Sequence, residues 1–186
     1  MVNANARDDG WQPAPPCWDV RLRRWLIDRG SLTRRLQARC RRFSVEVVAQ
    51  RLLPATRDEG LLLGVPRAQR ALVREVRLLC DGLPVVFARS VLAHRSLRGP
   101  WRMVGGLGTR PLGAAVFADP TVTRQPLHFS RVGHGHSLHR RIGAALGASF
   151  KAGAPGLWAR RSVFLRGRHP LLVTEVFLPA ILGLAP

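Results

Sequence analysis

The sequence predicts a single α+β domain built on a mostly antiparallel sheet. Two pairs of apolar segments are each joined by a short turn, at Asp81-Gly82 and at 166–170, which is the pattern of β-hairpins. Helical patterns precede and separate these hairpins instead of alternating with single strands, as they would in a parallel α/β fold. The 186 residues, 46% of them hydrophobic, are enough to bury one core and too few for two comfortable domains.

Each predicted element follows from its hydrophobic period and from the residues at its ends. The first helix begins at Asp19, which can cap it, and its Trp25 and Leu26 share one apolar face. From Phe43 the residues become β-branched and alternate, which is typical of strands, and a loop containing Asp58 is expected before the first hairpin. In chain order, we predict helices at 18–26 and 33–40, a strand from 43, hairpin strands at 71–80 and 83–92, a Gly-rich loop at 99–109, a short helix ending near 117, a helix at 137–149, and hairpin strands at 158–165 and 171–178.

The two ends of the chain predict neither a signal peptide nor a membrane span. Residues 1–16, rich in Asn, Asp, Gly and Pro, are expected to form a flexible lead-in to the folded region 17–186. They lack the basic patch and apolar run of a signal peptide. The longest apolar stretch, 171–185, is too short to cross a bilayer and is interrupted by Glu175 and Pro179. We therefore expect a soluble protein.

The strong positive charge does not by itself predict a nucleic-acid-binding protein. The formal net charge is +19, carried almost wholly by arginine because Lys151 is the only lysine. The arginines are spread from Arg7 to Arg168 without a dominant block, whereas phosphate-gripping arms concentrate their charge. We therefore expect a solvated basic surface and no nucleic-acid partner. Three separated cysteines without a C-x-x-C pair favour reduced thiols in the cytoplasm over a disulfide framework: Cys17, Cys40 and Cys80.

No pattern in the sequence predicts a metal or a cofactor. His134, His136 and His139 are closely spaced, but no acid or cysteine accompanies them, so a metal site is not expected there. The glycines at 105–108 lack the preceding strand and the Gly-Lys-Ser/Thr ending of a phosphate-binding loop. The residues therefore indicate neither a metal site nor a phosphate-binding loop.

Two charged residues on apolar strand faces are the candidate catalytic residues. Glu175 shares its face with Val173 and Phe177, where a carboxylate is costly unless it is paired or used. Burial would raise the pKa of this carboxyl and a partner arginine would lower it. Arg74 also points with an apolar set, and a planar guanidinium in such a wall suits a bidentate grip on a carboxylate. The alternative is a structural role for both residues. Glu175 would then lie on an edge strand and reach solvent, or each residue would belong to a buried ion pair, for example one that joins Glu175 to Arg74.

The chain resembles the chorismate–pyruvate lyases of ubiquinone biosynthesis. The clearest match is the run Gly156-Leu157-Trp158-Ala159-Arg160-Arg161-Ser162 with its continuation at 170–180. Four further motifs match in order, and together they cover most of residues 18–180: Gly30-Ser31-Leu32-Thr33-Arg34-Arg35, Val73-Arg74-Glu75-Val76 with Leu79-Cys80-Asp81-Gly82, Arg110-Pro111-Leu112-Gly113, and Thr121-Val122-Thr123-Arg124.

This resemblance implies a fold, an activity and a place in the cell. The implied fold is a six-stranded antiparallel sheet flanked by helices, with the ligand enclosed beneath two helical flaps. The implied activity is the cofactor-free cleavage of chorismate into 4-hydroxybenzoate and pyruvate by a cytoplasmic protein, which we expect to be a monomer in transient contact with a membrane prenyltransferase. An insertion near 134–154 departs from compact members of the family and spares every matched site position.

The resemblance also implies roles for single residues. Arg74 matches the arginine that binds the ring carboxylate, Leu112 a position whose backbone assists there, and Glu175 the glutamate facing the oxygen end of the ring. Leu32 stands where the family often has Met as an apolar lid contact. A second basic residue is expected on the enolpyruvyl carboxylate, and the candidates are Arg89 and Arg161.

Two points stay open at the level of sequence. Glu175 either donates a proton to the departing ether oxygen, which burial favours, or accepts the proton that the ring loses. The same fold type also serves as a ligand-sensing domain of bacterial transcription regulators, which bind a small aromatic acid without catalysis. Those chains carry a helix-turn-helix domain, for which we expect no room before Trp18.

Overall fold

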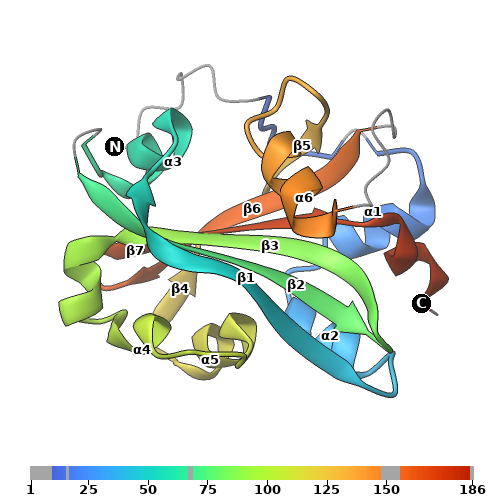
Figure 1. Ribbon diagram of the computed structural model, residues 1–186, viewed down its shortest axis with the longest axis horizontal. Coiled ribbons are helices and arrows are strands. Elements are labelled where there is room, and N and C mark those ends of the chain that lie inside the picture. The colour runs from blue at the N-terminus through green and yellow to red at the C-terminus, as the bar shows by residue number, and fades with distance from the viewer. Residues whose placement is uncertain (1–9, 16, 67–68, 148–155, 185–186) are drawn as a thin grey trace.

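A twisted antiparallel sheet forms the centre of the molecule, with helices on both of its faces (Figure 1). The structure is a computed structural model that describes residues 10–15, 17–66, 69–147 and 156–184. The strands are β1 (Phe43–Pro54), β2 (Arg70–Cys80), β3 (Leu83–Ala93), β4 (Val122–Arg124), β5 (His128–Val132), β6 (Leu157–Arg166) and β7 (His169–Phe177). The helices are α1 (Val20–Leu26), α2 (Leu32–Gln37), α3 (Arg57–Leu63), α4 (Arg102–Gly105), α5 (Leu112–Ala118) and α6 (His139–Leu146), with 3-10 turns at His94–Arg98 and Pro179–Gly183.

The strand order confirms the predicted α+β class and its antiparallel sheet. In the described residues the order is β1-β2-β3-β7-β6-β4, and β5 pairs with β6 beside β4. The strands β4 and β5 pair with successive parts of β6, so seven strands occupy six positions in the sheet. This arrangement agrees with the six-stranded sheet that the family resemblance implies, with the outer position divided in two.

Both predicted hairpins are present, and their turns show why. Asp81 and Gly82 have φ angles of 52° and 83°, the left-handed conformation that a tight turn between β2 and β3 requires. The Asp81 carboxylate also accepts a hydrogen bond of 2.8 Å from the Arg42 backbone, which fixes this turn against the start of β1. In the second hairpin Gly167, with φ 59°, provides the same freedom between β6 and β7.

The helix α3 and the two short strands β4 and β5 were not predicted from the sequence. The loop expected around Asp58 is wrong, because Arg57–Leu63 forms a helix whose first turn is stabilised when Glu59 Oε2 accepts a 2.9 Å hydrogen bond from the Thr56 backbone. Thr-x-x-Glu is a recognised start signal and would have indicated this helix. Of the helix predicted at 137–149, α6 accounts for His139–Leu146. Residues 148–149 of that prediction lie outside the described residues, as do residues 150–154 of the expected insertion and most of the expected lead-in.

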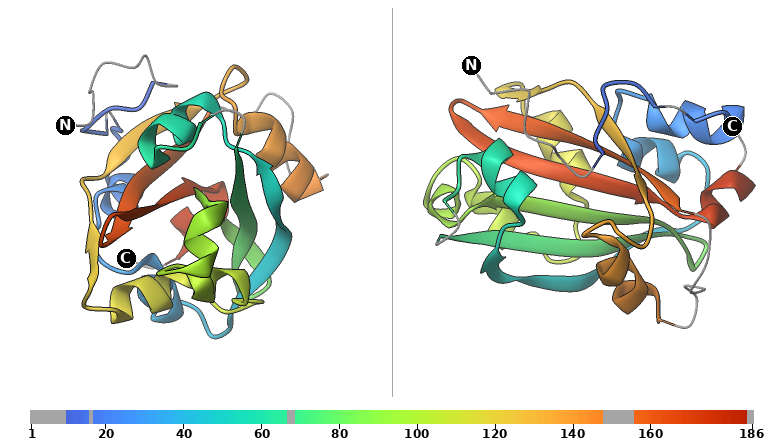
Figure 2. Two further views of the ribbon diagram at one scale, coloured as in Figure 1. Left: turned by 90° about the vertical axis from the view of Figure 1, so that its left-hand side faces the viewer. Right: turned by 90° about the horizontal axis from the view of Figure 1, so that it is seen from above.

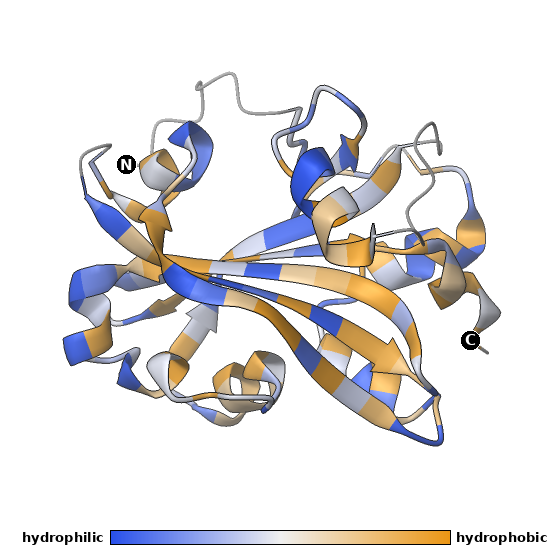
Figure 3. Ribbon diagram, viewed as in Figure 1, coloured by the Kyte–Doolittle hydropathy of each residue, from blue (hydrophilic) through white to orange (hydrophobic). Residues whose placement is uncertain are grey.

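Helices cover the two faces of the sheet with separate hydrophobic clusters (Figure 2). On one face, here called the pocket face, α1 and α2 pack over one end of the sheet, and α4 and α5 pack over the other. On the opposite face, α3 and α6 each form their own cluster. Figure 3 shows the central strands coloured mostly as hydrophobic, with isolated hydrophilic bands along them.

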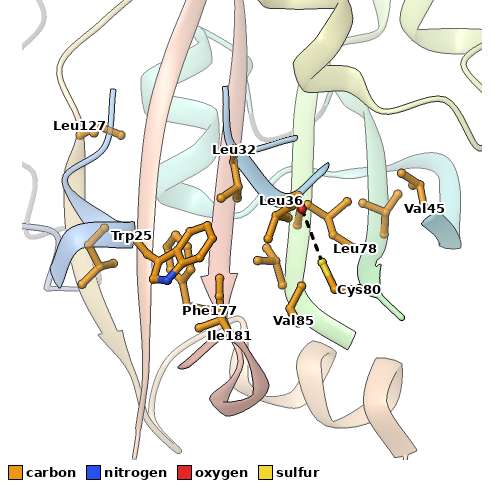
Figure 4. Close-up of a cluster of buried hydrophobic side chains, with 14 of the residues drawn as sticks. Trp25, Leu32, Leu36, Val45, Leu78, Cys80, Val85, Leu127, Phe177 and Ile181 are labelled. Atoms are coloured by element: carbon orange, nitrogen blue, oxygen red, sulfur yellow. Dashed lines mark hydrogen bonds between the residues drawn. The ribbon is translucent and has the colours of Figure 1, made fainter. Parts of the chain in front are cut away.

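The α2 helix is held on the sheet by its apolar residues. Leu32 and Leu36 are buried and point from α2 toward the strands, where Leu36 packs near Val45 and Leu78 (Figure 4). Burying a leucine side chain contributes about 1.5–3 kcal/mol, so these two contacts position the helix firmly. The Ser31 hydroxyl caps α2 by accepting from the Arg34 backbone. No helix in the described ranges is both long enough and apolar enough to cross a membrane.

Candidate active site

A pocket lies on the pocket face where α2 and α5 meet above the centre of the sheet. Its volume is about 50 Å³ counted to the centres of water molecules, which is room for only a few waters. Most of the lining is apolar. The residues that line it are Leu32, Thr33, Val45, Arg74, Val76, Leu78, Ala88, Ser90, Pro111, Leu112, Gly113, Val116, Phe117, Arg124, Phe164, Val173 and Glu175.

The register of the sheet brings Arg74 and Glu175 together. Arg74 on β2 stands opposite Ser90 on β3, and Ser90 stands opposite Val173 on β7. Glu175 is two residues farther along β7 and therefore points to the same face. Two strand spacings and one side-chain repeat give about 12 Å between the Cα atoms of Arg74 and Glu175. The two candidate catalytic residues thus line one pocket, and the separation of their Cα atoms leaves space for a six-membered ring between the two side chains.

Arg74 is a buried cation without a carboxylate partner among the described residues. Its residue is 2% exposed, and its guanidinium donates to Gln50 Oε1 at 3.1 Å and to the Arg110 carbonyl at 3.4 Å. Burial lowers the pKa of Arg74, and no carboxylate of the described chain lies within ion-pair distance to oppose that effect. The ion pair between Arg74 and Glu175, which the sequence left open, does not form. A buried cation held only by neutral oxygens retains its capacity for an anionic ligand.

Glu175 is paired instead with Arg160. Arg160 Nε donates to Glu175 Oε2 at 2.5 Å, and the two residues are direct partners across β6 and β7. The Nη1 atom of Arg160 also donates to the carbonyls of Trp25, Leu26 and Asp28, at 2.9, 3.2 and 2.6 Å. Arg160 therefore joins the end of α1 to the carboxylate of Glu175. In this pair Arg160 is the hydrogen-bond donor and Glu175 the acceptor.

Two short helices cover the pocket and touch each other there. Leu32 and Thr33 come from α2, and Leu112 and Gly113 come from the first turn of α5. A Cβ added at Gly113 would lie 2.8 Å from Thr33 Oγ1, so the close approach of the two helices depends on glycine at this position. The positions of α2 and α5 agree with the two helical flaps that the resemblance implies.

Arg89 and Arg161 lie on the opposite face, and the expectation that they reach the pocket is corrected. Arg89 is fully buried and donates to Glu59 Oε1 at 2.7 Å, to Glu59 Oε2 at 2.9 Å and to Glu75 Oε1 at 2.6 Å. Arg161 donates to Asp58 Oδ2 at 2.7 Å. The reason is register, because Arg89 is the direct partner of Glu75 and therefore points away from Arg74.

The ion pairs on that opposite face fix α3 to the sheet. Burial alone would raise the pKa of Glu59, but the hydrogen bonds and charge of Arg89 outweigh it and hold the pKa below its usual range. A second guanidinium, from Arg141 on α6, lies 3.3 Å from Glu75 Oε1. The role of this network is structural, because each buried charge in it lies against an opposite charge.

Two further arginines of the pocket face were missed as site residues. Arg160 and Arg124 appeared in the sequence only as parts of motifs, although strand alternation places Arg160 on the face opposite that of its neighbour Arg161. Arg124 ends a strand of three residues, too short for a periodic signal. For the histidines of 134–139, no group of three metal-binding side chains gathers among the residues that the structure describes.

Comparison with known proteins agrees with this geometry. A family model described as chorismate lyase matches residues 8–183. Three curated relatives carry the name "Probable chorismate pyruvate-lyase". The relative from Azoarcus sp. is 50% identical, and the match covers 96% of this chain and 95% of the relative. The relative from Aromatoleum aromaticum is 51% identical over 93% of this chain and 92% of the relative, and that from Nitrosospira multiformis is 47% identical over 99% of this chain and 100% of the relative.

Solved structures with a similar fold include two C-terminal domains. The PhnF C-terminal domain aligns with a TM-score of 0.56 at 14% identity over 80% of this chain and 89% of its own. The C-terminal domain of the histidine utilization repressor from Pseudomonas syringae aligns with a TM-score of 0.52 at 14% identity, over 75% of this chain and 93% of its own. These likenesses show the fold alone. By its family match and its close relatives, the chain belongs to the chorismate lyase family.

Proposed function

We propose that this chain is a chorismate pyruvate-lyase that forms 4-hydroxybenzoate and pyruvate at the start of ubiquinone biosynthesis. The observation that carries the proposal is the buried, carboxylate-free guanidinium of Arg74 in the same apolar pocket as Glu175. Family membership and the names of the relatives point to the same reaction.

The substrate is a dianion with a ring carboxylate and an enolpyruvyl carboxylate. In the proposal Arg74 binds the ring carboxylate through two N–H groups, and the backbone N–H of Leu112, the first of α5 and therefore free of a helical partner, adds a third donor. The apolar side chains of Val76, Ala88 and Val116 contact the ring faces. Glu175 then lies at the oxygen end of the ring.

The chemistry is an elimination that makes the ring aromatic. The bond between the ring and the ether oxygen breaks, the ring loses one proton, and the electrons of that C–H bond complete the aromatic system. The departing enolpyruvate takes up a proton to become pyruvate. Glu175, whose Oε2 accepts a hydrogen bond from Arg160, is assigned the role of proton acceptor at the hydroxyl-bearing side of the ring. This assignment reverses the preference for a proton donor that burial alone suggests.

The narrow pocket implies that the covering helices move. About 50 Å³ accommodates a few waters and not a six-membered ring with two substituents, so α2 and α5 must separate to admit chorismate. Their return would exclude water from the reacting carbons. Release of 4-hydroxybenzoate needs the same opening, which predicts a burst of product in the first turnover when release is slower than chemistry.

The test is direct conversion. Purified chain is incubated with chorismate in the presence of a chelator, and 4-hydroxybenzoate and pyruvate are quantified. The proposal expects equal amounts of both products, at a rate that the chelator does not change. Formation of neither product would refute it. The variant Arg74→Met serves as the matched control, because it should retain the fold and lose most of the rate.

A second function is favoured by the fold alone. One of the similar solved domains is part of a repressor, so a chain of this fold binding a small aromatic acid without turnover is the alternative. The same assay separates the two, because a sensing domain would bind 4-hydroxybenzoate and leave chorismate unchanged.

The remaining expectations concern the setting of the enzyme. We propose a cytoplasmic monomer that takes chorismate as its only substrate and passes its product to a membrane prenyltransferase by transient contact. Light scattering of the purified chain tests the monomer, and co-sedimentation with prenyltransferase-containing membranes tests the contact.

A further inference from the structure

The pocket contains a second arginine for which the described part of the chain provides no carboxylate partner. Arg124 ends the edge strand β4, where it pairs with Phe164 of β6, and its side chain lines the pocket. Four strand spacings, about 19 Å measured along the sheet, separate the Cα positions of β2 and β4, so Arg124 and Arg74 approach the pocket from opposite sides. Glu175 comes from β7, which lies between them.

Neutral groups hold the Arg124 guanidinium in place. Its Nε donates to Ser162 Oγ at 2.8 Å, and its Nη1 donates to the Arg29 carbonyl at 2.9 Å. The guanidinium carbon lies 5.3 and 5.6 Å from the ring centroids of Phe164 and Phe117. Two of the five N–H groups are thus used, and the Nη2 amino group makes no hydrogen bond in the described part of the chain.

The electrostatic environment of Arg124 is that of an unsatisfied cation. Burial lowers its pKa to about 10, and the charge of Glu175 offsets only part of that effect because the carboxylate is not within ion-pair distance. The ionisable side chains at the pocket are Arg74, Arg124 and Glu175 in the lining, with Arg160 paired to Glu175 beneath it. Three guanidiniums and one carboxylate leave an excess of two positive charges, which matches a ligand carrying two carboxylates.

We propose that Arg124 binds the enolpyruvyl carboxylate of chorismate and so forms the second anionic subsite of the pocket. The inference rests on the proposed lyase function and replaces Arg89 and Arg161 as the source of the second cation. Because Arg124 also holds the carbonyl of Arg29, in the segment that joins α1 to α2, binding at this subsite is coupled to the position of a covering helix. The leaving group therefore remains fixed until the covering helices open.

The experiment compares two ligands on one variant. Chorismate carries both carboxylates, whereas 4-hydroxybenzoate carries only the ring carboxylate. In Arg124→Met, kcat/KM for chorismate is expected to fall about 10- to 100-fold, as for the loss of a charge-assisted hydrogen bond, while the Kd of 4-hydroxybenzoate stays within about twofold. Arg124→Lys, which keeps the charge and loses the fork, is expected between wild type and Arg124→Met. Arg168→Met, in the exposed β6–β7 turn, removes one charge elsewhere and should change neither value.

Two results for Arg124→Met would overturn the proposed subsite. An unchanged kcat/KM in Arg124→Met overturns it, and so does an equal loss for both ligands, which would identify Arg124 as a structural tether between Ser162 and Arg29. If wild-type protein converts no chorismate, the lyase function fails separately, and calorimetric titration with chorismate and 4-hydroxybenzoate still compares the two carboxylates. Binding of chorismate that is equally tight in wild type and Arg124→Met would then refute the subsite.

Discussion

Arg74 and Arg89 offer a matched pair of perturbations, because they are the same residue type on adjacent strands with opposite surroundings. Both are almost fully buried, with 2% and 0% of the residue exposed. Arg74 meets two neutral oxygens on the pocket face, whereas Arg89 meets the carboxylates of Glu59 and Glu75 on the opposite face. The account predicts that Arg74→Met and Arg89→Met have opposite effects on activity and stability.

The magnitudes follow from what each guanidinium leaves behind. Removing Arg89 leaves the buried carboxylate of Glu59 without its guanidinium and that of Glu75 with only Arg141, which costs about 3–5 kcal/mol of unfolding free energy, or a fall in Tm of about 6–20 °C for a chain of this size. Removing Arg74 strands no charge and relieves the desolvation of a buried cation, so the unfolding free energy should rise by about 0–2 kcal/mol. In activity the order reverses. Loss of a bidentate carboxylate clamp costs about 3–5 kcal/mol in the transition state, a fall in kcat/KM of about 10²- to 10³·⁵-fold.

The assay pairs thermal unfolding with steady-state conversion of chorismate for both variants. Arg74→Met should melt at or above the wild-type temperature and be nearly inactive. Arg89→Met should melt far lower and, at a temperature where it is folded, keep kcat/KM within about tenfold of wild type. An Arg74→Met variant that is as destabilised as Arg89→Met would show that Arg74 is a structural residue, and the reasoning from its missing carboxylate would fail.

Three further predictions concern the proton acceptor, the ion network and the covering helices. Glu175→Gln keeps the shape of the side chain and removes its charge, so kcat should fall about 10²- to 10⁴-fold; unchanged single-turnover rates would remove Glu175 from the chemistry. Because Arg89 holds the pKa of Glu59 below its unfolded value, the stabilisation from this pair is complete above about pH 4.3 and is lost as the pH falls through the folded pKa. Unfolding curves from pH 6.5 to 3 should therefore fall less steeply for Glu59→Gln than for wild type, and parallel curves would contradict the pairing. Gly113→Ala places a Cβ 2.8 Å from Thr33 Oγ1 and should weaken 4-hydroxybenzoate binding by about 1–3 kcal/mol in calorimetry, whereas Gly106→Ala, which meets nothing within 4 Å, should not.

Local signals in the sequence were sufficient for most of the fold. The Asp81-Gly82 turn is specified by the two residues that adopt it, and the apolar segments on either side are long enough to be recognised as strands. The helix at Arg57–Leu63 was missed although Thr56 and Glu59 carry its start signal, because Asp58 and Gly60, which flank Glu59, are residues typical of loops. The strands β4 and β5 are only three and five residues long, and they exist because β6 offers them an edge.

The site was only partly predictable from the sequence, because the sequence does not give the register between neighbouring strands. Alternation within a strand tells which residues share a face, and it correctly separated Arg74 from Glu75. It does not tell which face of one strand continues a given face of the next, so Arg89 was grouped with its own apolar neighbours and assigned to the wrong side of the sheet. For the same reason the partner of Glu175, which is Arg160 on the adjacent strand, became apparent only from the pairing of β6 with β7.

The central claim is that Arg74 binds the ring carboxylate in the pocket between α2 and α5, and one thermodynamic cycle tests it most directly. The Kd values of 4-hydroxybenzoate and of its uncharged amide, 4-hydroxybenzamide, are measured on wild type and on Arg74→Met. The account predicts that wild type prefers the carboxylate by about 10²-fold and that Arg74→Met binds the two ligands within about threefold of each other. A preference for the carboxylate that survives undiminished in Arg74→Met would contradict the account.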